Sequence, residues 1–332
     1  DVKLNDASVV LETSRLMGAG ARVPLKFDPN VTINGTTTLC PMFPGAILAF
    51  KGKNETGEWF QVSQILTTSA TYLNGSGSWS FHGRFRSSLC FVPNTYESNS
   101  KLGPFIDVNN AKVQTGDVDV SPLDTFRSKM LAPLRAVMEE HRGMTVLIIP
   151  SPRDLISNHA VFPQAPLHMT SERILFLPNP CTFTIDHVRF AASSVDILFH
   201  LQSQLLRKRV VPTEPAAKPD MMQILSSCIL EQRSFYPLFP SYPQDVNLDI
   251  SHSELLKIEA VAPDVLILPS NLKQFHKVVQ GTAIVNPSLA SKGTHALVHI
   301  PDASTDPDST AGERARVQLP STGLSMNAAL ES

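Results

Sequence analysis

The sequence lacks a long hydrophobic run. None of its apolar stretches approaches the roughly 20 residues that a membrane-spanning helix requires, although apolar residues make up 42% of the 332-residue chain. The first residues, DVKLNDAS, also lack the basic, apolar and small-residue progression of a secretory signal peptide. The chain begins with Asp rather than Met, as a fragment or a processed chain would. We expect a soluble protein with enough core for about two domains.

Cysteine is scarce, and no two cysteines form the CxxC pair that is typical of structural zinc sites. We expect reduced, buried thiols in an intracellular protein. Four sequons, NVT, NGT, NET and NGS, lie within the first 76 residues and would be glycosylated in a secreted protein. Their composition is equally typical of turns, which is the interpretation we prefer. The four cysteines are Cys40, Cys90, Cys181 and Cys228.

An excess of charge of either sign is absent as well. The chain has 28 basic and 30 acidic residues, which gives a net charge of -2 and no general attraction to a phosphate backbone. A nucleic-acid role would therefore require a local basic patch. The triplet Arg207, Lys208 and Arg209 could be a nuclear-import element, but we interpret it as a complement to the C-terminal dipole of the preceding helix.

Residues 1–75 contain short alternating runs separated by turn signals. The runs SVVLET, ARVPLKF, AILAFKG and EWFQVSQIL alternate with GAG, DPN, NGT, FPG and NETG. About five short strands in this length predict a small β-barrel of the oligonucleotide-binding type. The region has six basic and six acidic residues. This balance favours a protein-binding barrel over one that binds single-stranded nucleic acid.

Residues 76–101 have no sustained period and are predicted to be an irregular linker. From residue 102 onward, apolar runs alternate with helical patterns, which predicts a layered α/β domain over 102–320 and a tail over 321–332. The segment CTFTIDHVRFAAS predicts a hairpin that turns at Asp186 and His187. Strands are expected at 145–150, 173–178, 264–269, 282–286 and 295–300, and helices at 122–141, from about 194, and at 221–232.

Four of these strand ends share one chemistry: IIPSPRD, FLPNPCTF, LILPSNL and IVNPS place proline beside serine or asparagine. The carboxyl ends of strands form the functional edge of such a domain. A metal-dependent phosphoesterase needs several Asp, His and Asn ligands there to activate a water. Proline offers no side-chain ligand, so we predict that this edge of the sheet lacks the metal ligands of an active phosphoesterase. Ser151 and Ser270 are predicted to act in turns or caps.

Isolated catalytic patterns are weak. There is no Walker loop, GxSxG elbow or GxGxxG helix start. TGDVD resembles a GDxxD metal motif but follows no apolar strand, and His295 and His299 flank a strand-like ALV. The alternative function is therefore an active metal-dependent phosphoesterase that uses Asp117, Asp119, His295 and His299.

Several collinear segments resemble a known family. GPFIDV, LIIPSPRDL, VFPQAP, FLPNPCTFTIDHVRFAASSVDILFHL, ILEQRSFYPLFP, PDVLILPSNLKQF and VNPSLASKGTHALVHI resemble the B subunits of DNA polymerase alpha, the non-catalytic second subunits of the polymerase alpha-primase complex. SVVLETSR and MFPGAILAFKG resemble the barrel of that family. The small subunits of the delta and epsilon polymerases share the architecture, but QRSFYPLFP is most similar to the alpha subunits.

The resemblance implies an oligonucleotide-binding-type barrel and a calcineurin-like phosphoesterase domain that has lost its metal ligands. It implies no enzyme activity, catalytic residue, metal or cofactor. The resemblance further implies a nuclear scaffold protein that binds the C-terminal domain of the polymerase catalytic subunit and, indirectly, the primase subunits. Nucleic-acid contact is then weak or indirect. Composition alone makes Phe235, Tyr236 and Phe239 candidate partner contacts, with core packing as the alternative for each.

The sequence departs from the family in two places. Residues 74–101 do not resemble the first strand and helix of the family's phosphoesterase domain, so we suspect a gene-model error and expect the isolated chain to be unstable. The family's N-terminal helical domain has no counterpart here.

Overall fold

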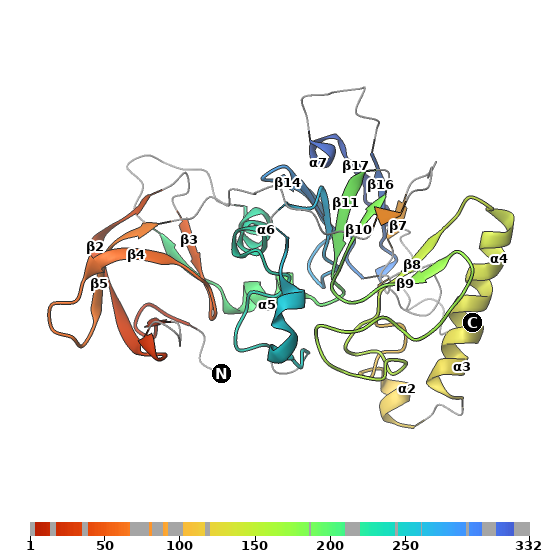
Figure 1. The fold of residues 1–332 in the computed structure, drawn as a ribbon, viewed down its shortest axis with the longest axis horizontal. Helices are drawn as coiled ribbons and strands as arrows, with labels where there is room; N and C mark the ends of the chain where they lie inside the picture. Colours follow the sequence, from red (N-terminus) through yellow and green to blue (C-terminus); the bar gives the residue numbers. More distant parts are fainter. Residues whose placement is uncertain are drawn as a thin grey trace. The chain divides into compact units, whose positions relative to one another are not determined.

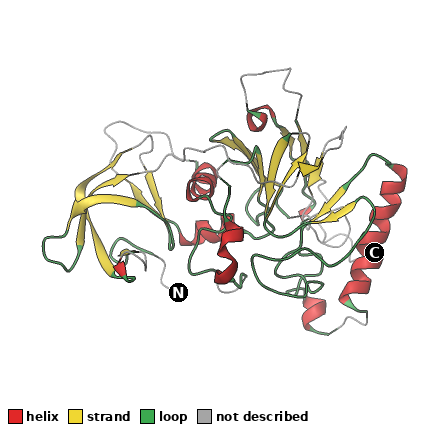
Figure 2. Cartoon of the chain, in the orientation of Figure 1, coloured by secondary structure: helices red, strands yellow, loops and turns green. Residues whose placement is uncertain are grey.

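The computed structural model divides into two compact units, which Figure 1 and Figure 2 show as ribbons. The first unit comprises residues 1–71, 200–233 and 237–240, and the second comprises 72–199, 234–236 and 241–332. The structure describes residues 4–13, 18–34, 39–66, 80–81, 89–91, 102–116, 120–185, 187–209, 220–242, 245–259, 261–289, 292–300 and 310–321. Among these, no helix combines the length and the apolar composition needed to cross a membrane.

The first unit contains a four-stranded sheet in the order β1-β2-β5-β4. Strand β2 pairs antiparallel with β1 and parallel with β5, and β4 pairs antiparallel with β5. Strand β5 buries Val62 and Ile65 and exposes Gln61 and Ser63. Strict alternation would separate Val62 and Ile65, and the register shift between β4 and β5 at Lys51 and Gly52 interrupts it. The strands are β1 (Val10–Glu12), β2 (Arg22–Asn34), β4 (Ala49–Lys53) and β5 (Phe60–Leu66). Their core contains Val9, Leu25, Val31, Cys40, Met42, Val62 and Ile65.

The basic triplet lies in a strand. Helix α5 (Ile197–Gln204) ends before it, and β12 (Leu206–Arg209) pairs antiparallel with β3 (Leu39–Met42). The triplet thus follows the helix in sequence, as expected, but its backbone belongs to a strand, and its role as a complement to the helix end stays a prediction. The free edge of β3 supplies hydrogen-bond partners to the backbone of β12, and this pairing places Leu206 opposite Met42.

Helix α6 (Met221–Gln232) has the predicted bounds. Asp220 accepts a hydrogen bond from the backbone N–H of Met222 (3.0 Å) at its N-terminus. Arg233 ends the helix in the left-handed conformation (φ 48°). The helix buries its apolar face through Leu225, Cys228, Ile229 and Leu230.

Two long-range contacts hold the loop between β3 and β4. The Gln232 side chain accepts from the backbone N–H of Ile47 (2.8 Å) and donates to its carbonyl oxygen (3.0 Å). The backbone N–H of Phe239 donates to the Pro44 carbonyl (2.9 Å). Gly45 (φ +88°) lies so close to this segment that a Cβ there would be 2.6 Å from the Phe239 nitrogen. The loop therefore requires glycine at this position.

Gly45→Ala is expected to lower the free energy of unfolding by about 2–3 kcal/mol, because it adds steric overlap to the cost of a positive φ. Gly57→Ala is the matched control, since Gly57 has φ +80° but nothing within 4 Å of its Cβ position. It should cost only about 1 kcal/mol. Chemical denaturation of both variants checks the prediction, and equal losses would contradict it.

The second unit is built on a six-stranded mixed sheet in the order β14-β15-β13-β11-β10-β6. Strand β13 pairs in parallel with β11 and β15. The predicted hairpin is confirmed, because β10 and β11 pair antiparallel with Ile185 opposite Val188. The strands are β6 (Ser80–Phe81), β10 (Cys181–Ile185), β11 (Val188–Ala192), β13 (Val265–Ile267), β14 (Phe275–Val279) and β15 (Thr282–Asn286).

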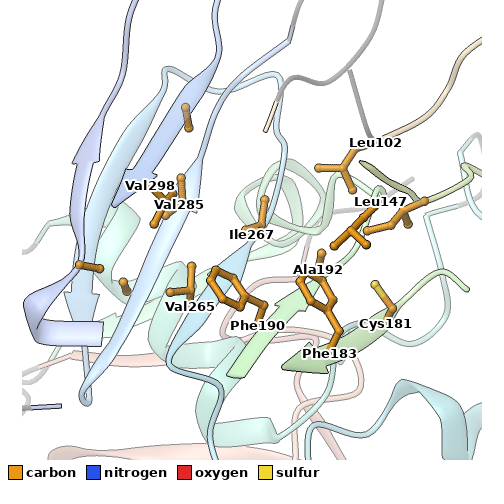
Figure 3. Packing of buried hydrophobic residues seen from close by; sticks show 14 residues of the cluster. Leu102, Leu147, Cys181, Phe183, Phe190, Ala192, Val265, Ile267, Val285 and Val298 are labelled. Carbon is orange, nitrogen blue, oxygen red and sulfur yellow. The ribbon is translucent and has the colours of Figure 1, made fainter. Parts of the chain in front are cut away.

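One core cluster packs along this sheet. Figure 3 shows Val265, Ile267 and Val285 from the parallel strands, and Phe183 stacks on Phe190 with a ring separation of 5.4 Å. A separate three-stranded sheet contributes Val298 to the same cluster. Its strands are β7 (Leu89–Phe91), β16 (Ala296–His299) and β17 (Arg316–Gln318). The second unit also contains the short helices α7 (Ala311–Arg314) and η2 (Ile250–Leu256).

A second core forms between β8 (Val146–Ile148), β9 (Ile174–Phe176) and the helices that precede them. The predicted helix over 122–141 is present, but it changes to π geometry before Pro133. This proline has no N–H to donate within the helix, which favours a local rearrangement. The helical segments are α2 (Ala111–Gln114), α3 (Pro122–Phe126), the π segment η1 (Arg127–Leu131) and α4 (Ala132–Glu140).

Residues 76–101, predicted to be an irregular linker, contribute two short strands. Strand β6 pairs in parallel with β10, and β7 pairs antiparallel with β16. The expected instability of the isolated chain remains a prediction.

Candidate functional site

The candidate site is the set of segments that follow the carboxyl ends of the strands in the second unit. We call it the strand-end edge, and it comprises residues 150–154, 179–180, 193–194, 269–271 and 286–288. Its polar residues are unusually buried. Asn179, Ser193, Ser270 and Asn286 have no exposed surface, and Asp154 is 4% exposed.

Asn286 uses all of its hydrogen-bonding capacity on neighbouring backbone. Its Oδ1 accepts from the N–H groups of Ser270 (2.9 Å) and Ser288 (2.8 Å). Its Nδ2 donates to the carbonyls of Leu272 (3.4 Å) and Lys273 (3.2 Å). Because an amide oxygen has two lone pairs and the nitrogen two hydrogens, this side chain is saturated.

Asn179 has the same role after β9. Its Oδ1 accepts from the Ser194 N–H (3.1 Å) and the Ser193 hydroxyl (3.3 Å), and its Nδ2 donates to Ser194 Oγ (2.7 Å). The Ser194 hydroxyl in turn donates to the Pro150 carbonyl (2.7 Å). These bonds join the ends of β8, β9 and β11.

Asp154 is the buried carboxyl group of the edge. Its Oδ1 accepts from the N–H groups of Phe105 and Ile106, the latter at 3.0 Å, and its Oδ2 accepts from the Ser151 N–H (2.9 Å). A Cβ added at Gly103 would overlap Asp154 Oδ2. The carboxyl group therefore ties the segment at 103–106 to the end of β8.

Burial raises the pKa of Asp154 from 3.8 to about 7, and the three N–H donors offset only part of this effect. Between these two values the folded state retains a proton that the unfolded state has lost. Stability is therefore expected to fall as the pH rises from about 4 to 7, by at most about 1.4 kcal/mol per pH unit.

Denaturation at several pH values, compared between the natural chain and Asp154→Asn, measures this contribution. As the pH rises, the free energy of unfolding of the natural chain should fall relative to that of Asp154→Asn. A pH-independent difference would show that Asp154 keeps an ordinary pKa.

Charged side chains in and beside the edge also have partners. Asp196 accepts from the N–H groups of Asn271 (2.7 Å) and Phe199 (3.0 Å). The Lys292 ammonium donates to the carbonyl (2.8 Å) and Oδ1 (2.9 Å) of Asn271. Arg153 pairs with Asp107 (2.8 Å) and with Asp245 (3.6 Å).

This donor set is poorly suited to holding a metal pair. A two-metal site needs several oxygen and nitrogen atoms that converge on the ions, whereas the Asn and Asp oxygens here already accept backbone N–H groups. Within the described ranges no group of three His, Cys, Asp or Glu residues could hold an ion. The buried Oε1 of Gln164, whose amide nitrogen donates to the Ser151 carbonyl of the edge, has no hydrogen-bond partner among the described residues. A single amide oxygen does not make a metal site.

The predicted phosphoesterase ligands do not form a group among the described residues. Asp117 and Asp119 lie outside those residues. His299 is exposed and lies opposite Arg316 in the β16–β17 pair, and the backbone N–H of His295 donates to the Pro320 carbonyl (3.4 Å).

Both serines act in turns, as predicted. Ser270 Oγ accepts from the Leu272 N–H (3.2 Å), and Ser151 Oγ accepts from the Arg153 N–H (3.4 Å).

The three predicted partner contacts occupy different environments. Phe235 and Tyr236 are buried, with 2% and 4% exposed, whereas Phe239 is 53% exposed. Tyr236 packs edge-on against Phe162 at 5.9 Å, and its hydroxyl accepts from the Tyr242 N–H (3.0 Å). Core packing therefore accounts for Phe235 and Tyr236, and Phe239 keeps an accessible ring.

The residues that organise the edge are not evident from the sequence alone. In the sequence, Asn179, Asn286 and Asp154 stand out only as members of strand ends that lack metal ligands. The available signal is the recurrence of Asn before Pro after an apolar run, in LPNP and IVNP. A short amide directly after a buried strand can bind the backbone of the next turn.

The chain combines a small unit of β-sheets with a mixed α/β unit whose strand ends are tied together by their own side chains. The family model for the DNA polymerase alpha/epsilon B subunit matches residues 102–277. The model for the OB domain of the DNA polymerase alpha B subunit matches residues 1–68, which confirms the predicted barrel type. The chain belongs to the DNA polymerase alpha/epsilon B subunit family.

Three similar relatives are each named as the B subunit of DNA polymerase alpha. The Schizosaccharomyces pombe protein is 31% identical over 88% of this chain and 55% of its own length. The Saccharomyces cerevisiae protein is 28% identical over 90% of this chain and 52% of its own length. The Rattus norvegicus protein is 25% identical over 88% of this chain and 50% of its own length. The chain thus spans about half the length of these relatives.

Proposed function

We propose that this chain is a non-catalytic accessory subunit of DNA polymerase alpha-primase. It binds the C-terminal domain of the polymerase catalytic subunit in the nucleus during the initiation of DNA replication, and it reaches the primase subunits indirectly. The α/β unit serves as an inactive, calcineurin-like phosphoesterase domain that keeps its shape for binding.

The main support for this proposal is that the polar side chains of the strand-end edge form hydrogen bonds with the backbone of the edge itself. Asn179, Asn286 and Asp154 give their oxygen atoms to backbone N–H groups of the same edge. Ligands of a catalytic ion would have to leave those N–H groups buried and unpaired, at a cost of about 1–3 kcal/mol each. An edge of this kind is better suited to preserving a shape than to activating a water.

Co-expression with the C-terminal domain of the catalytic subunit tests the proposal. We expect a stable one-to-one complex on size exclusion, and no manganese or iron bound to this chain. Bound manganese or iron in this chain, together with phosphodiester turnover that Asp117→Ala abolishes, would contradict the proposal in favour of the phosphoesterase. Oligonucleotide affinity should be weak, because the net charge of the chain is -2.

A further inference from the structure

The first unit is completed by a segment that lies far from its sheet in the sequence. Residues 200–233 form one compact unit with residues 1–71. Two elements of this segment contact the early part of the chain. Strand β12 pairs along β3, with Leu206 opposite Met42, and helix α6 follows it in the same unit. We call β12 and α6 together the clasp.

Strand β3 depends on the clasp for its pairing. Among the described strands, β3 and β12 form a sheet of their own, separate from the four-stranded sheet. Cys40 and Met42 of β3 nevertheless lie in the core of the first unit, and Leu206 of β12 packs against the same core. Buried backbone N–H and C=O groups need hydrogen-bond partners. Without β12, the backbone of β3 would lose the partners that keep its side chains in the core.

Helix α6 covers the same strand. Cys40 of β3 and Cys228 of α6 are both buried, with 0% and 2% exposed. Burial raises the pKa of Cys40 to about 12, and the Glu231 carboxylate adds to this effect. The pKa of Cys228 is raised by burial and, in addition, by Glu231 and by Cys40 itself, so the two thiols lie within electrostatic range of each other. The end of α6 is fixed as well, because Gln232 binds both backbone polar groups of Ile47, at 2.8 and 3.0 Å.

We propose that the clasp opens and closes as one cooperative element, so that β12 and α6 leave β3 together while the second unit stays folded. Both elements cover the same short strand, and the loss of either exposes surface that the other needs for its own packing. Elements with such shared contacts open as a unit. The second unit has core clusters of its own, which do not include residues of the clasp. Opening would uncover the paired edge of β3 and both thiols at the same time.

Thiol labelling of the full chain under native conditions tests the proposal. Alkylating reagents attack the thiolate, which a buried thiol of raised pKa forms only after it has been exposed. Cys40 and Cys228 report on the clasp, and Cys181 in the core of the second unit is the internal reference. Mass spectrometry of the labelled peptides measures each rate separately. We expect a common rate for Cys40 and Cys228 that is higher than the rate for Cys181.

One variant in each clasp element shows whether the two elements are coupled. Leu206→Ala removes apolar contact of β12 and should raise the labelling rates of both clasp thiols by about tenfold, when reclosing is faster than labelling. Gln232→Ala removes the two bonds from α6 to Ile47 and should raise both rates by about threefold or more. Neither variant should change the rate for Cys181.

Leu175→Ala is the matched control in the second unit, because Leu175 is a partly buried leucine that packs against the cluster containing Cys181. It should speed the labelling of Cys181 and leave Cys40 and Cys228 unchanged. If the chain does not fold alone, the same rates are compared in its complex with the catalytic-subunit domain of the proposed function.

Two results would overturn the proposal. If Leu206→Ala accelerated only Cys40 and Gln232→Ala only Cys228, β12 and α6 would open separately. A single rate for all three thiols, shifted equally by every variant, would mean that only unfolding of the whole chain exposes them.

Discussion

Asp154→Leu is expected to lower the free energy of unfolding by roughly 3–6 kcal/mol, which would leave little or no folded protein. The substitution leaves the N–H groups of Phe105, Ile106 and Ser151 without their acceptor in the interior. Leucine has a similar size, so the loss reports mainly on the unpaired donors. Chemical denaturation measures the change, carried out in complex with the partner domain if the isolated variant does not fold.

Asp107→Asn is the matched control for Asp154→Leu. Asp107 forms a partly exposed ion pair with Arg153, and Asn keeps an oxygen for the N–H of Asn109. It should cost less than about 1 kcal/mol, as ion pairs near the surface do. If the two variants lost equal stability, Asp154 would not be the group that fastens 103–106 to the end of β8.

Asn286→Ala is expected to cost roughly 2–4 kcal/mol of unfolding free energy. It removes the acceptor of the Ser270 and Ser288 N–H groups, which belong to fully or almost fully buried residues. Asn271→Ala is the control at the same edge, because Asn271 is exposed and its amide oxygen accepts from the Lys292 ammonium rather than from a buried N–H group. Its effect should stay within about 0.5–1 kcal/mol.

Asn286→Asp distinguishes the scaffold from a metal site. Aspartate would keep the two acceptor contacts but would face the carbonyls of Leu272 and Lys273 with negative charge, so we expect lower stability and no gain in manganese affinity. An enzyme that used this position as a ligand would instead bind manganese more tightly with the added carboxylate. Titration of both proteins with manganese separates the two outcomes.

Local patterns predict much of the fold. The apolar run PDVLILP contains the buried strand β13, and the helix expected at 221–232 has the bounds of α6. The hairpin of β10 and β11 follows from its turn and alternation. In each case the interactions that decide the structure lie within a few residues, where sequence periodicity reports on them.

The features that the sequence does not reveal depend on distant partners. Strand β12 pairs with residues more than 160 positions earlier, and Gln232 binds Ile47 across 185 positions. Asp154 binds Phe105 across 49 positions. No local period encodes such pairs, so the sequence pattern places the basic triplet at a helix end. For the same reason composition does not separate the buried Phe235 and Tyr236 from Phe239.

Crystals of the chain in complex with its partner domain, soaked in manganese and measured for anomalous scattering, would decide whether the strand-end edge is a scaffold or a catalytic centre. We expect no manganese peak within coordination distance of Asp154, Asn179 or Asn286, because their oxygen atoms bind backbone N–H groups. Two neighbouring peaks at the strand-end edge would contradict this expectation and would support the alternative function, an active phosphoesterase.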